Sequence, residues 1–151
     1  MNFSFRLATE ADAPGVSELI VGLAGFFAAS SVDEISDKFM ASIGVEAVAE
    51  RFASSQFHCF VAEDSAGLCG FAALRDSSHL YHLFVSERAQ SQGLGRLLWN
   101  EALRESSCPE ISVNATVSAV GFYESLGFVR AAPDVVEDGI AFAPMVFNVD
   151  S

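Results

Sequence analysis

The segment Gln90–Arg96 carries the clearest chemical signal in the chain, with the sequence Gln-Ser-Gln-Gly-Leu-Gly-Arg. Its two glycines, Gly93 and Gly95, have no side chain and let the backbone approach a ligand closely. The segment precedes an amphipathic helix whose first N–H groups lack partners and carry partial positive charge. It predicts an anion site suited to a phosphate or pyrophosphate, although an ordinary glycine-rich turn explains the same residues. Neither a Walker A loop nor a complete Rossmann fingerprint is present.

A second segment, Ala119–Phe128, places Phe122, Tyr123 and Leu126 at helical spacing before Gly127. The phenolic hydroxyl of Tyr123 is a candidate proton donor. A buried tyrosine whose hydroxyl is hydrogen bonded within the core is the alternative interpretation.

A third segment, His79–His82, has three titratable side chains within one expected strand. Strand alternation predicts His79 and Tyr81 on one face and His82 on the other, unless a bulge changes the parity. An imidazole with an ordinary pKa of about 6.5 suits proton transfer near neutral pH. Histidines on opposite faces do not form a metal pair, so we expect no metal.

Alternating strands and helices must position these segments. Apolar patterns predict strands at residues 3–7, 57–63, 68–75, 79–85, 111–115, 128–132 and 140–148. Periodicity and capping residues predict helices at residues 14–27, within 33–54 (one or two), and at about 93–105 and 118–126. A loop at 133–139 joins the last two strands. This order predicts a mixed α/β (α+β) fold, antiparallel in its first half and with crossovers in its second.

The length of 151 residues predicts one domain, spanning residues 1–151. An apolar content of 51% excludes a disordered chain. The longest apolar stretch, residues 19–29, is too short to span a bilayer, and no secretory signal precedes it. Three scattered cysteines fit neither a disulfide framework nor a metal site, so we expect a cytoplasmic protein without membrane contact.

The charge balance restricts the partners. The formal net charge is −12, from 8 basic and 20 acidic residues. Because nucleic-acid binding needs a positive field, we expect no nucleic-acid partner. The negative field would attract a cationic ligand, although solubility alone is the simpler explanation.

Together the first two segments resemble two motifs of the GNAT superfamily of acyl-CoA-dependent N-acyltransferases. Gln90, Gly93 and Gly95 match the family's Q/R-x-x-G-x-G/A loop. The second segment is similar to its A-x-x-F-Y-x-x-x-G-F signature, carried by Ala119, Phe122, Tyr123, Gly127 and Phe128. The resemblance implies a mostly antiparallel central sheet of about six to seven strands. It also implies helices on both faces and a splay between the fourth and fifth strands.

The resemblance also implies acetyl-CoA as cosubstrate. Loop amides would hold its pyrophosphate, which assigns Gln90, Ser91, Gln92, Gly93, Leu94, Gly95 and Arg96 to cofactor binding. The backbone of the preceding strand would bind the pantetheine, through Leu83, Phe84 and Val85. Phe122 is assigned to the same site. Thr116 stands where many members have an asparagine, so Asn114 is either the substitute amide or a strand-end turn residue.

The family's usual route is direct attack of a neutral amine on the thioester. Tyr123 would then protonate the leaving thiolate or position its sulfur. The offset from Gln90 matches His79 to a base position in several members, with Tyr81 ordering a water on the same face. Alternatively, His79 is a surface residue and water accepts the proton.

Acceptor specificity in the family usually comes from the first helices and the last hairpin. We therefore assign Phe26, Phe27, Asp33 and Glu34 to the acceptor site. In the alternative interpretation, the aromatic residues belong to the core and the acidic residues form a solvated face. The expected activity is N-acetyl transfer to a primary amine of a small molecule or peptide. The alternatives are a non-catalytic acyl-CoA-binding regulatory module, or an acyltransferase using another acyl-CoA or acceptor. The last strand could also pair across a homodimer.

Overall fold

A computed structural model describes residues 2–149, which form a sheet of eight strands. The strands are β1 (Ser4–Leu7), β2 (Phe57–Asp64), β3 (Gly67–Arg75), β4 (His79–Val85), β5 (Glu110–Thr116), β6 (Val129–Arg130), β7 (Val135–Glu137) and β8 (Ile140–Asn148). Their order is β1-β2-β3-β4-β5-β8-β6, and β7 also pairs with β8. Only the contact between β4 and β5 is parallel.

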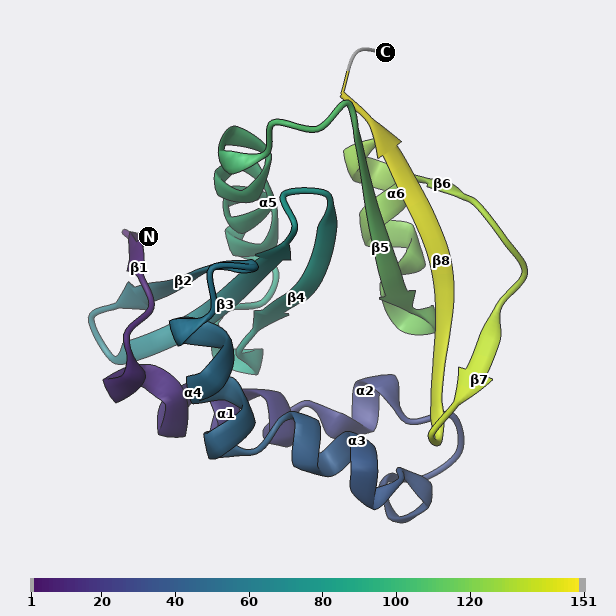
Figure 1. The fold of residues 1–151 in the computed structure, drawn as a ribbon, viewed down its shortest axis with the longest axis horizontal. Helices are drawn as coiled ribbons and strands as arrows, with labels where there is room; N and C mark the ends of the chain where they lie inside the picture. Colours follow the sequence, from purple (N-terminus) through teal and green to yellow (C-terminus); the bar gives the residue numbers. More distant parts are fainter. Residues whose placement is uncertain (1, 150–151) are drawn as a thin grey trace.

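Helices cover both faces of this sheet (Figure 1). The α-helices are α1 (Ala13–Gly22), α2 (Ala24–Phe27), α3 (Asp37–Ser42), α4 (Val45–Ala53), α5 (Leu94–Glu105) and α6 (Val120–Leu126). Four 3₁₀ turns are η1 (Glu10–Asp12), η2 (Val32–Glu34), η3 (Glu87–Ala89) and η4 (Val117–Ala119). No helix within residues 2–149 is long and apolar enough to cross a membrane.

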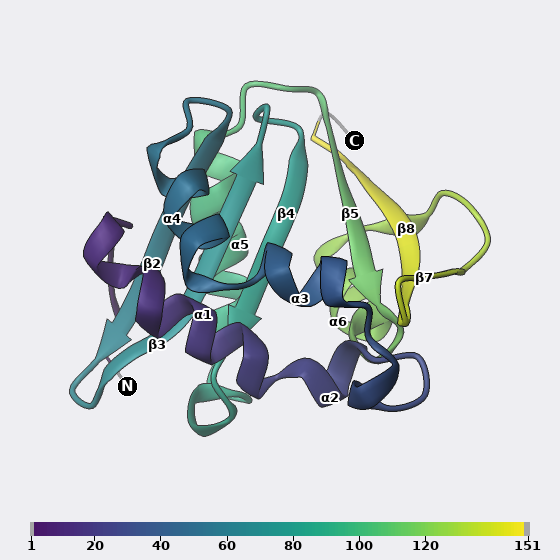
Figure 2. The same cartoon turned by 60° about the horizontal axis from the view of Figure 1, so that its bottom comes forward.

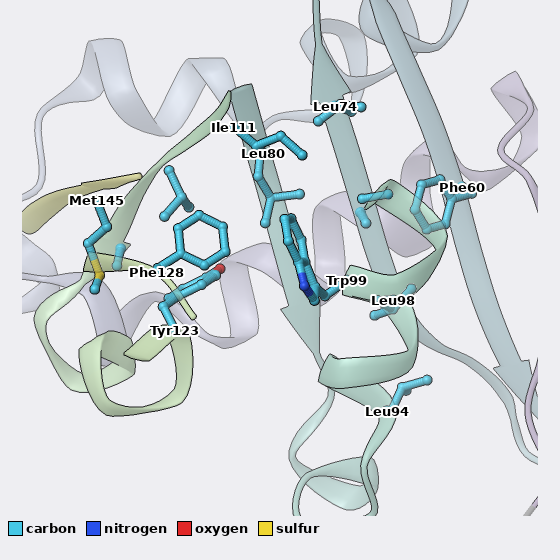
Figure 3. Packing of buried hydrophobic residues seen from close by; sticks show 14 of the residues in the cluster. Phe60, Leu74, Leu80, Leu94, Leu98, Trp99, Ile111, Tyr123, Phe128 and Met145 are labelled. Atoms are coloured by element: carbon cyan, nitrogen blue, oxygen red, sulfur yellow. The ribbon is translucent and has the colours of Figure 1, made fainter. Parts of the chain in front are cut away.

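Two apolar cores lie on opposite faces of the sheet. The first packs α5 and α6 against the strands through Leu80, Leu98, Trp99 and Phe128 (Figure 3). The second packs α1, α2 and α4 against the other face, and its members include Val16, Ile20, Val48 and Phe71. Alternating strand residues supply both cores, because successive side chains point to opposite faces.

The parting of β4 from β5 is the main irregularity of the sheet. These strands pair only at His79↔Ser112 and Leu80↔Val113, and beyond these pairs they diverge. Figure 2 shows α3 in front of the resulting gap and α2 below it, whereas α1 lies in front of β2 and β3. The mixed fold, the helices on both faces and the splay between the fourth and fifth strands are confirmed.

Most expected elements are present, with local differences. The expected helix over 14–27 is divided at Leu23 into α1 and α2. The expected strand at 128–132 has only two residues, and the expected loop at 133–139 contains β7. The sheet therefore has eight strands instead of six or seven, because β8 is long enough to pair with β6 and β7 in succession.

The β7–β8 turn is locked to η2 and α3 on the α1–α4 side of the molecule. Ser36 donates two hydrogen bonds to Asp138 in this turn. Its backbone N–H bonds to the Asp138 carbonyl oxygen at 2.9 Å, and its hydroxyl bonds to Asp138 Oδ1 at 3.1 Å. Gly139 has φ +78°, and a Cβ built there would lie 2.3 Å from the carbonyl oxygen of Glu34. The contact between the turn and η2 therefore requires glycine.

We expect Gly139→Ala to lower the free energy of unfolding by about 1–3 kcal/mol, because the added methyl group must displace backbone atoms. A matched control is Gly25→Ala, since a Cβ at Gly25 meets nothing within 4 Å. Urea denaturation of the three proteins provides the measurement. Equal stability of the Gly139→Ala and Gly25→Ala variants would show that the turn is not tightly locked.

Candidate active site

A cavity of about 490 Å³ occupies the gap between β4 and β5. The strands contribute Leu80–Val85 of β4 together with Val113, Asn114 and Thr116 of β5. The remaining lining residues are Leu23, Phe26, Phe27, Gln90, Ser91, Gly95, Ser118, Ala119, Phe122 and Tyr123. Because β4 and β5 no longer share hydrogen bonds here, their facing backbone groups are available to a ligand.

Residues from both faces of the sheet line the cavity. On one side its walls come from the α5–α6 core, including Leu83, Phe122 and Tyr123. On the other side they come from the α1–α4 core, including Phe27 and Phe84. Two ligands that enter from opposite faces would therefore meet between the strands.

The β4–α5 loop, residues 86–93, ends in a site that fits a phosphate. Ser91 and Gly93 adopt left-handed conformations, with φ of 67° and 82°, which turn the chain into α5. Within the described residues, the amides of Leu94, Gly95 and Arg96 have no hydrogen-bond partner. Free N–H groups at the start of a twelve-residue helix bind anions.

The predicted loop residues have different roles. Gln90, Ser91 and Gly95 line the cavity, and the amide of the Gln90 side chain donates to the Val85 carbonyl at 3.1 Å. The Leu94 side chain is buried in the α5–α6 core, so only its backbone is available to a ligand. The remaining two side chains bond elsewhere: Gln92 to the carbonyl oxygen of Arg88, and Arg96 weakly to that of Ser125.

Gly95 serves packing in addition to close approach of a ligand. A Cβ at this position would lie 2.9 Å from Cζ of Phe122. The Phe122 ring lines the cavity and therefore rests directly on the first turn of α5. This contact joins the two sequence motifs.

Tyr123 is buried in the α5–α6 core and also lines the cavity. Its ring packs against those of Phe122 and Phe128, at centroid distances of 5.2 and 5.3 Å. Figure 3 shows its hydroxyl oxygen pointing away from α6, toward the side of β4. Burial raises the pKa of Tyr123, so the phenol remains protonated at neutral pH and can donate.

The predicted face of His82 is wrong. The β3–β4 register shifts between Ala73↔His82 and Leu74↔Leu80, which leaves Tyr81 as an extra residue in a bulge. Tyr81 and His82 consequently lie on the same face of β4, on the α1–α4 side. Both line the cavity, and His82 is buried among aromatic rings.

His79 does not line the cavity. It lies at the end of β4 that still pairs with β5, and its Nδ1 is 2.7 Å from the Ser112 hydroxyl. Burial, with a contribution from Arg75, lowers the pKa of His79 to about 4. Position and pKa both make His79 a poor candidate for the base.

Arg51 of α4 contacts both Tyr81 and His82. Its Nη1 lies 3.4 Å from Nε2 of His82, and its Cζ lies 5.1 Å from the centroid of the Tyr81 ring. Burial, then Arg51, lowers the pKa of His82 to about 3, so this imidazole is neutral. The described residues contain no group of three or more His, Cys, Asp or Glu arranged to hold a metal.

The four residues assigned to the acceptor site lie in two different places. Phe26 and Phe27 line the cavity. Asp33 and Glu34 are exposed on η2 and do not line it, which agrees with the alternative of a solvated acidic face. On β5, Asn114 and Thr116 both line the cavity, so either side chain is available to a ligand there.

Seven residues line the cavity that the sequence did not assign to the site: Leu23, Leu80, His82, Val113, Thr116, Ser118 and Ala119. The Ser118 hydroxyl donates to the Phe26 carbonyl oxygen at 3.2 Å, tying α2 to η4 at the cavity. No local pattern identifies this contact, because the two residues are far apart in the chain. The neighbouring signature motif was the available signal for Ser118.

Comparisons with solved structures identify the same fold. A GCN5-related N-acetyltransferase from Rhodopseudomonas palustris has a TM-score of 0.79 at 19% identity, covering 99% of this chain and 97% of that one. The PaiA N-acetyltransferase of Thermoplasma acidophilum, solved with coenzyme A, has a TM-score of 0.76 at 17% identity, covering 98% and 99%. A mutant of the spermidine N-acetyltransferase SpeG from Vibrio cholerae has a TM-score of 0.68 at 20% identity, covering 97% and 93%. At these identities the similarity shows the fold alone.

The family follows from the sequence match. None of the curated proteins matches the chain. A family model described as an acetyltransferase (GNAT) domain matches residues 25–149. This range includes Tyr123 and the segment 90–96, called the anion-site loop below. The chain therefore belongs to the GNAT acetyltransferase family.

Proposed function

We propose that this protein is an N-acetyltransferase that moves an acetyl group from acetyl-CoA to a primary amine of a small molecule or peptide. The observation that carries the proposal is the cavity through the splayed sheet. Its lining brings together Gln90, Ser91 and Gly95 of the loop, Tyr123, and aromatic side chains that include Phe26, Phe27 and Tyr81. A module that only bound acyl-CoA would not need the aromatic lining on the α1–α4 side of the sheet.

The loop and β4 fit the parts of acetyl-CoA. The free amides of Leu94, Gly95 and Arg96 suit the pyrophosphate, because a helix N-terminus stabilises negative charge. Beyond Leu80, the β5-facing edge of β4 is unpaired and can bond the pantetheine amides. The solved PaiA neighbour contains coenzyme A, which supports this choice of cosubstrate.

Acetyl-CoA supplies a thioester, whose C–S bond breaks as the amine nitrogen forms the new C–N bond. The Tyr123 phenol, which its raised pKa keeps protonated at neutral pH, donates a proton to the departing sulfur, and the phenolate is then reprotonated from water. The aromatic wall of Phe27 and Tyr81 positions the acceptor against the carbonyl carbon. The spermidine acetyltransferase neighbour supports an amine as acceptor, because its reaction acetylates one.

The amine proton goes to water in this proposal. In the part of the chain that the structure describes, the cavity is lined by no carboxylate and by one histidine, His82, whose low pKa makes it a weak base. The neutral imidazole and the Tyr81 hydroxyl can instead order the water that accepts the proton. The acceptor must then lose its proton largely through its own ionisation.

Acetyl-CoA at 100 times its dissociation constant should add about 2.7 kcal/mol to the free energy of unfolding.

The assignment of the loop to phosphate binding is tested by comparing Gly93→Asp with Gly93→Asn, since both residues tolerate the left-handed conformation and only aspartate adds negative charge. Because a Cβ at Gly93 meets nothing within 4 Å, neither variant should disturb packing. We expect the aspartate variant to bind acetyl-CoA about tenfold more weakly than the asparagine variant, in isothermal titration calorimetry. Equal affinities would place the phosphates elsewhere.

Tyr123→Phe should lower kcat about 10²–10⁴-fold while leaving acetyl-CoA affinity nearly unchanged, because only the proton donor is lost. Tyr81→Phe is the comparison variant, since it removes the other tyrosine hydroxyl at the cavity, which only orders the accepting water, and it should lower kcat less than Tyr123→Phe does. Thiol release under conditions where chemistry limits the rate gives the comparison. A Tyr123→Phe enzyme with undiminished kcat would assign Tyr123 a structural role.

The pH dependence separates the base candidates. His79 has a pKa of about 4 and is already deprotonated well below neutrality, so it cannot produce a rising limb near neutral pH. We expect kcat/KM to rise with pH, with an apparent pKa that follows the acceptor's own pKa. This rise should persist in the His79→Ala variant. Two acceptors of different basicity should be compared. A limb near pKa 6.5 that disappears in His79→Ala would restore His79 as the base.

A further inference from the structure

The cavity walls formed by residues 2–149 carry no formal charge. None of the lining residues is an aspartate, glutamate, lysine or arginine, and its one histidine is neutral. The acids expected to serve an amine, Asp33 and Glu34, are exposed elsewhere. Moving an ammonium group from water into such a site is unfavourable, because no opposite charge compensates for its lost hydration.

The charged groups directly behind the wall are cationic. Arg51 contacts His82 and lies over the Tyr81 ring, and among residues 2–149 it forms no ion pair with a carboxylate. Arg75 lies over the same ring with its Cζ 5.3 Å from the centroid, and it is partly offset by Asp76 at 4.0 Å. The wall therefore has a positive potential on the α1–α4 side.

The effect of Arg51 reaches a group that lines the cavity. After burial, its positive charge is the largest contribution to the lowered pKa of His82. A second ammonium on a bound acceptor would experience the same repulsion. The overall net charge of −12 attracts amines from a distance, but that charge lies on the surface and not on the cavity wall.

We infer that the acceptor end of the cavity selects monoamines whose remaining part is apolar or anionic, that it rejects diamines and polyamines, and that Arg51 determines this selectivity. The inference rests on the proposed function and specifies its acceptor. Phe26, Phe27 and Tyr81 supply the apolar contact, and Arg51 supplies the charge discrimination. The preference is opposite to that of a spermidine acetyltransferase.

Three probes of equal chain length test this inference: hexylamine, 1,6-diaminohexane and 6-aminohexanoate. Their dissociation constants are measured on the CoA-saturated protein by calorimetry, and their kcat/KM values by thiol release from acetyl-CoA. We expect the diamine to be about tenfold worse than hexylamine, and the amino acid to be equal or better. Preferred binding of the diamine, or no binding of any probe, would overturn the inference.

Arg51→Gln should reduce the discrimination between hexylamine and the diamine about tenfold, whereas Arg51→Lys should retain it by keeping the charge. Arg104→Gln, on the exposed surface of α5, should leave all three probes unchanged. A structural role for Arg51 would weaken all probes equally, so an unchanged ratio in Arg51→Gln overturns the assignment. Retained stabilisation by acetyl-CoA shows that each variant is folded.

The two proposals fail in different ways. Probes that bind in the expected order without any thiol release would overturn the proposed acetyl transfer and leave the selectivity supported. Thiol release with the diamine as the preferred acceptor would support the enzyme and overturn the selectivity.

Discussion

The parallel contact between β4 and β5 ends after two residue pairs, and the rest of the site depends on that early ending. Continuous pairing would consume the backbone groups of both strands and close the sheet. With the strands apart, a cavity lies between them, lined from both faces of the sheet. The α5–α6 core joins the two halves, because it contains residues of β2–β4 as well as residues of β5 and β8. β8 secures the far half by pairing with β5 over seven residues. The apolar packing and the β5–β8 pairing on either side of the gap therefore keep the two strands apart.

Local patterns were sufficient to predict much of the fold and one half of the site. β4 and β8 have the predicted bounds, because their apolar runs end at clear turn residues. The anion-site loop and Tyr123 are found by motifs that are contiguous in sequence. β7 was not predicted, since three residues form a strand only when β8 lies beside them.

The other half of the site depends on contacts that no contiguous segment reveals. The bulge at Tyr81 arises from the register with β3, and it places His82 on the cavity side. Arg51 reaches the same wall from α4, about thirty residues earlier in the chain. Acidic residues in the sequence pointed to an amine-binding site, yet exposure keeps Asp33 and Glu34 in water. The electrostatic potential in a cavity depends on which charged side chains line it and which stay in water. The amino-acid composition contains no information on that placement.

The contact between Gly95 and Phe122 has an evolutionary consequence. The family motif accepts glycine or alanine at this loop position, but in this chain a methyl group would meet the Phe122 ring at 2.9 Å. A lineage descending from this protein can therefore acquire alanine at 95 readily only after the residue at 122 has shrunk or its ring has moved. The order of the two substitutions matters, so they are epistatic. Homologues should show correlated residue sizes at these two positions, a signal that an alignment can detect without any knowledge of the ligand.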